Sequence, residues 1–279
     1  MLPTVQLGPL TLPVAPLLTI ASFWIGIGIA ARAGKRFSLS EDAILNAGFF
    51  GVVSGIVGAR LWYVLEYFSY YQDRLGEVLS LNLNTLAPLE GILTGMVVAI
   101  IYLQRKKTPG AAFVDALAPG LAAFAAGSSL ANLASGAAFG EPANLPWSIY
   151  LWDARRHPTQ VYDFVLSLGI LAVTLRLLSF SRPSGRVFGV FLATFAASRL
   201  LTEGFRGDSA LLEGGWRTMQ FAWLALLVAA LAGLAWMDVR AAARPSTSVS
   251  SAPRQASATE VAYMEQESGN EKEKNPLER

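Results

Sequence analysis

The chain has 279 residues, of which 53% are apolar and 15% charged, and its formal net charge is +2. Soluble domains carry about 25% charged residues, and disordered chains combine low hydrophobicity with high net charge, so both classes are excluded and a membrane protein is expected. The absence of cysteine excludes disulfides, thiolate metal sites and a cysteine nucleophile within the chain. The single histidine, His157, excludes a polyhistidine metal centre, and we expect no metal and no cofactor.

Apolar segments long enough to cross a bilayer recur along the chain. A spanning helix needs about 20 mostly apolar residues, and seven stretches meet or approach that length: 10–31, 43–65, 89–104, 112–136, 160–180, 187–205 and 218–237. The third is short, and the fourth is rich in Gly and Ala, which lets helix backbones approach closely, so we expect both inside the bundle. The sequence therefore predicts an all-α fold, a polytopic membrane bundle of seven transmembrane helices.

The distribution of basic residues predicts the orientation of these helices. Lysine and arginine collect in the loops that follow the first, third and fifth stretches: Arg32, Lys35, Arg36, Arg105, Lys106, Lys107, Arg176, Arg182 and Arg186. Because positively charged loops stay in the cytoplasm, the N-terminus is expected outside and the C-terminus inside. We expect residues 1–240 to form the membrane domain and residues 241–279, which are polar and rich in Ser and Glu, to form a disordered cytoplasmic tail.

Two arginines fall inside the predicted spans, where a charge costs about 2.5–3.5 kcal/mol on insertion scales and marks a candidate functional site. Arg60 lies near the outer end of the second span, among aromatic residues that include Trp62 and Tyr63. One interpretation is that its side chain extends to the outer headgroup layer. The other is that it contacts a bound lipid headgroup, and the sequence leaves both open.

The second of these arginines, Arg199, belongs to a charged face of the sixth span. Arg199, Glu203 and Arg206 are spaced four and three residues apart, which places them on one side of a helix. An ion pair between Arg199 and Glu203 that only neutralises the arginine is one interpretation. The other is that the carboxylate holds the guanidinium while its remaining donors bind a phosphate, for which the planar fork is well suited.

His157 precedes Pro158 at the predicted entrance of the fifth span. Proline suits the first turn of a helix, and Gln160 is placed to cap that turn. His157 is then fixed near the membrane surface, either as an interfacial residue with a structural hydrogen bond or as a general base, since histidine accepts protons near neutral pH.

Several segments, in their order along the chain, resemble the prolipoprotein diacylglyceryl transferase family over about residues 8–237. They are Gly58-Ala59-Arg60 with Tyr63, Asp115-Ala116-Leu117-Ala118-Pro119-Gly120, Asn132 with Gly136 and Gly140, Pro146-Trp147, Arg156-His157-Pro158-Thr159-Gln160-Val161-Tyr162-Asp163, Arg199 with Glu203 and Arg206, and Thr218-Met219-Gln220. The resemblance implies a seven-helix enzyme of the bacterial plasma membrane with its N-terminus outside. It also implies transfer of the diacylglyceryl group of phosphatidylglycerol to the lipobox cysteine thiol of a prolipoprotein, with release of glycerol phosphate.

The resemblance also implies roles for residues of this chain. Arg199 would contact the phosphate, and Glu203 would orient that arginine. The base is left open between His157, Glu90 and a lipid- or water-mediated route. The substrate-binding positions would be Arg60, Asn132, Gly136, Gly140, Gln160, Tyr162 and Arg206. The implied partners are phosphatidylglycerol, the prolipoprotein signal peptide with its lipobox cysteine, and membrane lipid, with no nucleic acid.

Three positions depart from the family pattern. The family's arginine three residues before the asparagine falls on Ser129, and its acidic residue five after the asparagine falls on Ala137. The family's histidine at the entrance of the third span falls on Glu90, which is expected either to replace it as a base or to cap a helix. These departures leave two functions open: a divergent transferase, or a catalytically impaired relative that binds lipid or a partner protein.

Overall fold

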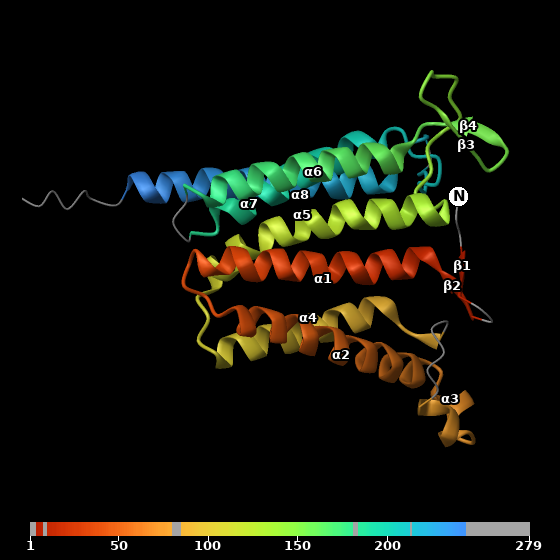
Figure 1. Ribbon diagram of the computed structural model, residues 1–279, viewed down its shortest axis with the longest axis horizontal. Coiled ribbons are helices and arrows are strands. Elements are labelled where there is room, and N and C mark those ends of the chain that lie inside the picture. Colours follow the sequence, from red (N-terminus) through yellow and green to blue (C-terminus); the bar gives the residue numbers. More distant parts are fainter. Residues whose placement is uncertain (1–3, 8–9, 80–84, 181–183, 213, 244–279) are drawn as a thin grey trace, which may run out of the picture. The chain divides into compact units, whose positions relative to one another are not determined.

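The computed structural model describes residues 4–7, 10–79, 85–180, 184–212 and 214–243 (Figure 1). The chain divides into two units, Met1–Met237 and Asp238–Arg279. Most of the second unit, and with it nearly all of the tail expected at 241–279, lies outside the described residues. The architecture below is therefore that of the first unit, together with the last turns of its final helix.

Seven long α-helices dominate the described chain, and each overlaps one of the predicted apolar stretches. They are α1 (Val14–Lys35), α2 (Glu41–Glu66), α4 (Pro88–Arg105), α5 (Gly110–Ser135), α6 (Thr159–Leu178), α7 (Arg186–Glu203) and α8 (Thr218–Ala242). Within the described residues, α1, α2, α5, α6 and α8 are long and apolar enough to cross a membrane. The all-helical membrane fold expected from composition is thus confirmed for five helices.

Short strands and helices precede or follow several of these long helices. β1 (Thr4–Leu7) and β2 (Leu10–Pro13) form an antiparallel hairpin before α1, and β3 (Ile149–Leu151) and β4 (Ala154–Arg156) form another before α6. A single-turn helix, α3 (Phe68–Tyr71), and a 3₁₀ helix, η1 (Leu75–Leu79), follow α2. The prediction that the first helix begins at residue 10 is wrong, because residues 10–13 pair with β1 and the helix begins after Pro13.

Local sequence explains several helix boundaries. The Ser40 hydroxyl accepts a hydrogen bond from the Ala43 amide at 3.3 Å and caps α2, whose first turn also carries two acidic residues. α5 ends at Gly136, which adopts a left-handed conformation with φ of 77°. α6 begins after Pro158, as predicted, but Gln160 does not cap it: its amide donates instead to the Ala137 carbonyl at 2.8 Å.

Glycines allow two pairs of helices to pack with their backbones close together. A Cβ added to Gly120 of α5 would lie 2.4 Å from the Gly26 carbonyl oxygen of α1, and one added to Gly95 of α4 would lie 2.4 Å from the Gly51 oxygen of α2. Small residues promote such close approach in membrane bundles. The buried position expected for the Gly/Ala-rich stretch is confirmed, because half of the most apolar window of α5 is buried.

The expectation that the third stretch lies inside the bundle is wrong. α4 packs along α2, but its opposite face carries large exposed apolar side chains: Leu89, Ile92, Leu93, Met96 and Val97. A membrane helix with one glycine-rich face and one face of large apolar residues buries the first against protein and presents the second to lipid. The short length of this segment therefore does not signify an interior position.

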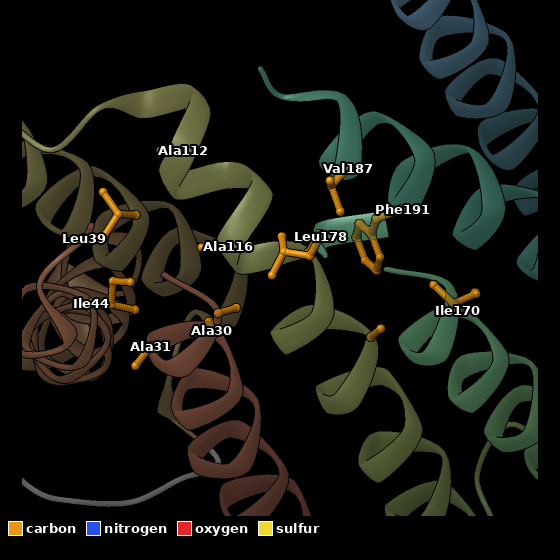
Figure 2. Close-up of a cluster of buried hydrophobic side chains, with 13 residues drawn as sticks. Ala30, Ala31, Leu39, Ile44, Ala112, Ala116, Ile170, Leu178, Val187 and Phe191 are labelled. Carbon is orange, nitrogen blue, oxygen red and sulfur yellow. The ribbon is translucent and has the colours of Figure 1, made fainter. Parts of the chain in front are cut away.

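A buried apolar cluster joins five helices where α5, α6 and α7 converge. It includes Ala30 of α1, Ile44 of α2, Ala116 of α5, and Val187 and Phe191 of α7 (Figure 2). Leu178 and Ile170 of α6 complete the same cluster. This cluster fixes one end of the helices whose opposite ends carry the candidate site.

A fully buried carboxylate anchors α7 beside this cluster. The Asp115 side chain of α5 accepts backbone hydrogen bonds from Ser184 at 3.0 Å, Gly185 at 2.8 Å and Phe188 at 3.0 Å. These donors include amide groups at the start of a helix, which have no partner within it. Asp115 therefore supplies the α7 N-terminus with acceptors from a neighbouring helix and fixes α7 against α5.

Candidate active site

Two connecting loops bring the ends of α5, α6 and α7 together. The Glu141 amide donates to the Phe205 carbonyl at 2.8 Å, and the Gly207 amide donates to the Phe139 carbonyl at 2.8 Å. An isolated β-bridge pairs Gly140 with Arg206 between them. The loop after α5 is thus joined by its backbone to the loop after α7, and the charged residues of α7 face the first turns of α6.

Arg199 forms an ion pair across a helix interface. Its Nη1 group donates to Oδ2 of Asp163, which lies one turn into α6. The side chain of Asp163 is 4% exposed and that of Arg199 is 20% exposed. The pairing of Arg199 with Glu203 expected from their spacing is wrong, because α6 packs directly on α7 and offers a buried carboxylate across that interface.

Most of the hydrogen-bond donors of Arg199 are not used within the described part of the chain. Among the described residues, its Nε and Nη2 groups have no hydrogen-bond partner, and the Trp223 ring lies 5.8 Å from the centre of the guanidinium. A guanidinium has five N–H donors in a rigid fork, so most of its capacity stays available. The side chain is anchored by a carboxylate, partly exposed and able to bind an anion.

Glu203 belongs to a second group of charges next to the Arg199–Asp163 pair. It is buried, accepts a hydrogen bond from the Ser209 hydroxyl at 2.5 Å and lies 3.8 Å from Nε of Arg206. Arg206 also donates to both carboxylate oxygens of Asp208, at 2.9 and 3.0 Å. The prediction that Arg199, Glu203 and Arg206 share one helix face is wrong for Arg206, because α7 ends at Glu203 and Arg206 lies in the following loop, where it pairs with Gly140 in a β-bridge. The sequence also misses the two aspartates that pair with the arginines.

The charge on Arg206 is stabilised by its surroundings. Partial burial opposes the charged form, but the hydrogen bonds that Arg206 donates to Asp208 and the negative charges of Asp208, Glu203 and Asp163 outweigh it and raise the pKa of Arg206 above its ordinary value. Since Asp163 contributes to this shift, both arginines lie within electrostatic reach of that carboxylate. The α6 and α7 charges therefore act as one connected cluster.

His157 lies between an aromatic group and the joined loops. Its Nδ1 atom is 3.3 Å from the Tyr162 hydroxyl, and its ring centroid is 5.2 Å from that of Phe205. The Tyr162 hydroxyl in turn accepts a hydrogen bond from Nε1 of Trp147 at 2.8 Å. In the described part of the chain, Nε2 of His157 makes no hydrogen bond, so one ring nitrogen is oriented by Tyr162 and the other is available.

Gly136 and Gly140 shape the loop beside His157. Gly136 is in the left-handed region, and its carbonyl accepts from Nε1 of Trp152 at 2.9 Å. A Cβ on Gly140 would lie 2.3 Å from the carbonyl oxygen of His157, so only glycine fits there. Both glycines thus have backbone reasons for their identity, and no substrate contact is needed to explain them.

Asn132 and Ser129 lie in the last turns of α5. Asn132 is half-buried, and its side chain makes no hydrogen bond to a described residue. Ser129 is buried on the side of α5 opposite Gly120, which packs on α1, and its hydroxyl donates to the Ala125 carbonyl at 2.9 Å. Ser129 is therefore a small residue that turns away from α1 and supplies no positive charge.

Arg60 occupies a different part of the molecule from Arg199. Its guanidinium donates to the carbonyl oxygens of Glu77, Val78 and Thr85, and the Tyr71 ring lies 5.2 Å from it. These acceptors belong to the connection between α2 and α4, which the arginine holds in place. The lipid-headgroup contact of Arg60 stays a prediction, and the contacts in the structure are those of a loop anchor.

Glu90 lies in the first turn of α4, and its side chain makes no hydrogen bond or ion pair to a described residue, while its backbone carbonyl accepts a hydrogen bond from the Thr94 hydroxyl at 2.7 Å. It borders a groove of about 460 Å³ whose other walls are apolar residues of α2 and α4, including Trp62 and Leu93. An acidic side chain in the first turn favours the helix macrodipole, but Glu90 does not cap the helix through a hydrogen bond. The structure does not place it among the charges of α6 and α7.

Among the residues that the structure describes, no three His, Asp or Glu side chains are grouped so as to hold an ion.

The main residue that sequence reasoning missed is Asp163, although it ends a segment that the family resemblance already included. An acidic residue one turn into a helix that opens with Pro158 was the available signal.

The chain is similar to known proteins over almost its whole membrane part. Residues 3–236 match the family described as prolipoprotein diacylglyceryl transferase. A Trichormus variabilis protein named phosphatidylglycerol–prolipoprotein diacylglyceryl transferase is 32% identical over 266 residues, or 90% of this chain and 93% of the relative. Proteins of the same name from Nostoc and Clostridioides difficile are 31% and 28% identical, covering 85% and 67% of this chain and 89% and 76% of their own lengths.

The family match includes the segments that carry Arg199, Asp163 and His157, and it agrees with the apolar helices of the fold. The relatives are bacterial, and the described helices are those of a protein that crosses the membrane several times. The chain is a multi-pass bacterial membrane protein and belongs to the prolipoprotein diacylglyceryl transferase family.

Proposed function

We propose that this chain transfers the diacylglyceryl group of phosphatidylglycerol to the lipobox cysteine of a prolipoprotein, as the names of its relatives state for them. The observation that carries the proposal is Arg199, which is held by the buried Asp163 yet keeps free donors and partial exposure. A phosphate is the substrate group that such a side chain fits best.

The proposed topology has all seven long helices in the membrane, with the N-terminus outside and the C-terminus in the cytoplasm. α4 and α7 have 18 residues each, so each is about 27 Å long, against a hydrocarbon core of about 30 Å. In this arrangement residues 1–240 form the catalytic domain, residues 241–279 form a cytoplasmic tail, and the Arg199 cluster lies toward the outer surface.

The proposed reaction is a displacement at the carbon that joins the diacylglyceryl group to the phosphate. The substrate thiol sulfur forms a bond to this carbon while the carbon–oxygen bond to phosphate breaks, so a thioether forms and glycerol phosphate leaves. Arg199 stabilises the negative charge that accumulates on the departing phosphate. Glu203 and Arg206 fix the electrostatic environment of that arginine.

The thiol proton also needs an acceptor. His157 is the better of the two proposed bases, because its Nδ1 atom is oriented by Tyr162 while its Nε2 atom is available. Its ring also lies against Phe205, which is next to Arg206 of the charged cluster in the sequence. Glu90 remains the second proposed base. Substrate contacts are proposed for the remaining positions: Arg60, Asn132, Gly136, Gly140, Gln160, Tyr162 and Arg206.

A transfer assay on the purified full-length protein tests the function. The protein is supplied in detergent with phosphatidylglycerol and a lipobox peptide, and the thioether product is detected by its mass. We expect product from the wild type, and a loss of at least about a hundredfold in rate for Arg199→Ala, since one lost donor to the transition state costs about 2.7–4 kcal/mol.

Arg32→Ala is the matched control, because Arg32 is an exposed arginine in the last turn of α1. Its rate should equal that of the wild type. Absence of product from the wild type, under conditions in which the Trichormus variabilis relative is active, would refute the proposed function. Undiminished turnover by Arg199→Ala would refute the role of Arg199.

A further inference from the structure

Two buried acceptor atoms on α6, one of them on the aspartate that pairs with Arg199, lack hydrogen-bond partners among the described residues. Among the described residues, Oε1 of Gln160 and Oδ1 of Asp163 receive no donor, although these residues are only 1% and 4% exposed. The other polar atoms of both side chains are used: Nε2 of Gln160 donates to the Ala137 carbonyl, and Oδ2 of Asp163 accepts from Arg199. The two residues are three positions apart, so they share one face of α6.

Unpartnered acceptors of this kind are rare in folded proteins and are costly, at about 1–3 kcal/mol each. Arg199 itself keeps unpartnered Nε and Nη2 donors. Spare donors on a cation and spare acceptors on its anchor therefore occur side by side in the candidate site.

We propose that Gln160 and Asp163 select the headgroup of the phospholipid by accepting hydrogen bonds from its hydroxyl groups, while Arg199 binds the adjoining phosphate. The class of ligand is a phosphodiester whose alcohol carries further hydroxyls, as a glycerol headgroup does. This proposal rests on the proposed function and assigns to it the residues that determine specificity.

A neutral hydroxyl suits these two oxygens better than an ammonium group does. The negative charge of Asp163 is already balanced by Arg199, and a further cation at this buried position would lose its hydration without a new partner charge. Hydroxyl donors satisfy both oxygens at no such cost. The pair therefore favours a polyol headgroup over one that ends in an amine.

The test compares two anionic phosphodiester lipids, one with headgroup hydroxyls and one with a small headgroup that has none. The full-length protein in detergent is titrated with short-chain phosphatidylglycerol and with phosphatidylmethanol of the same acyl chains, an anionic phosphodiester without hydroxyls. Binding is followed by tryptophan fluorescence, since Trp223 lies against Arg199. We expect the wild type to bind phosphatidylglycerol at least about tenfold more tightly, as one or two hydrogen bonds to buried acceptors allow.

The Gln160→Leu variant removes one acceptor and should reduce this preference severalfold, with little change in affinity for phosphatidylmethanol. Gln160→Glu keeps an oxygen acceptor for the headgroup but loses the amide that donates to the Ala137 carbonyl. This variant should therefore keep the preference for phosphatidylglycerol, which separates the headgroup contact from the contact with the loop. Gln104→Leu, at an exposed glutamine in the last turn of α4, is the control and should behave like the wild type.

Equal binding of the two lipids by the wild type would overturn the proposal. An equal loss of affinity for both lipids in Gln160→Leu would also overturn it, because that is the result expected if the acceptors hold only a buried water. Binding and transfer fail separately: a wild type that prefers phosphatidylglycerol but forms no thioether refutes the proposed function and leaves the headgroup site standing.

Discussion

Replacing Arg199 with methionine tests whether the ion pair with Asp163 is a buried, coupled unit. Methionine fills much of the space of the arginine stem but donates no hydrogen bond, so Asp163 would retain a buried charge with no partner among the described residues. Breaking a buried pair in this way costs about 3–5 kcal/mol. Because a fifth of the Arg199 side chain is exposed, water reaches the pair, and we expect the lower end, about 3 kcal/mol.

The companion variant removes both charges. Replacing a buried ion pair by apolar residues of similar volume is often neutral, so Arg199→Met combined with Asp163→Leu should regain most of the lost stability. Denaturant unfolding of the full-length protein in detergent, followed by far-ultraviolet circular dichroism, gives the four stabilities of the double-mutant cycle. The reasoning fails if the single Arg199→Met variant is as stable as the wild type. It also fails if the double variant is no more stable than the single Arg199→Met variant.

The same pair of variants separates folding from chemistry. The double variant should be close to the wild type in stability but should form no thioether, because it lacks the donors proposed to bind phosphate. A single variant that is both unstable and inactive cannot make this distinction. Measuring transfer and unfolding on the same preparations therefore shows whether Arg199 is needed for the reaction or only for the fold.

Three further perturbations follow from the packing. Asp115→Ala should cost at least about 3 kcal/mol, since three backbone donors lose a charged acceptor; an unchanged thermal unfolding midpoint would contradict this. Gly95→Leu should destabilise the protein by about 1–3 kcal/mol or more in the same assay, because its Cβ meets the Gly51 backbone, whereas Gly28→Leu, at an unobstructed helical glycine, should not. Arg60→Lys should loosen the connection between α2 and α4, which limited proteolysis would detect as new cleavage near residue 77; an unchanged digestion pattern would count against the anchor.

Helix positions were predictable from sequence because the bilayer imposes a length and an apolar composition that a single chain must meet locally. The start of α1 was not, since residues 10–13 are apolar enough for a helix and only their pairing with β1 makes them extended. The exposed face of α4 was also missed, because a short apolar segment looks alike whether its large side chains face protein or lipid. Only the packing of Gly95 on α2 shows which face is buried.

The candidate site was predictable where its residues lie on one helix and not where they meet across helices. The spacing of Arg199 and Glu203 placed both on one face of α7, whereas Arg206 lies beyond the end of that helix, in the loop that pairs with Gly140. The choice of Asp163 as the partner of Arg199 depends on how α6 packs against α7, which no spacing along one helix encodes. The capping role expected of Gln160 failed for a similar reason, since its amide is taken by a loop carbonyl distant in sequence.

The contacts of Arg60 bear on how charged residues in membrane proteins are counted. Its fork of N–H groups donates to peptide oxygens of the segment that connects α2 and α4, so these hydrogen bonds hold the chain and are not available to an anion at the same time. A tally of arginines near one leaflet therefore overstates the number of phospholipids such a surface attracts. A better measure of anion binding is the number of guanidinium N–H donors that are not already hydrogen-bonded to backbone carbonyls.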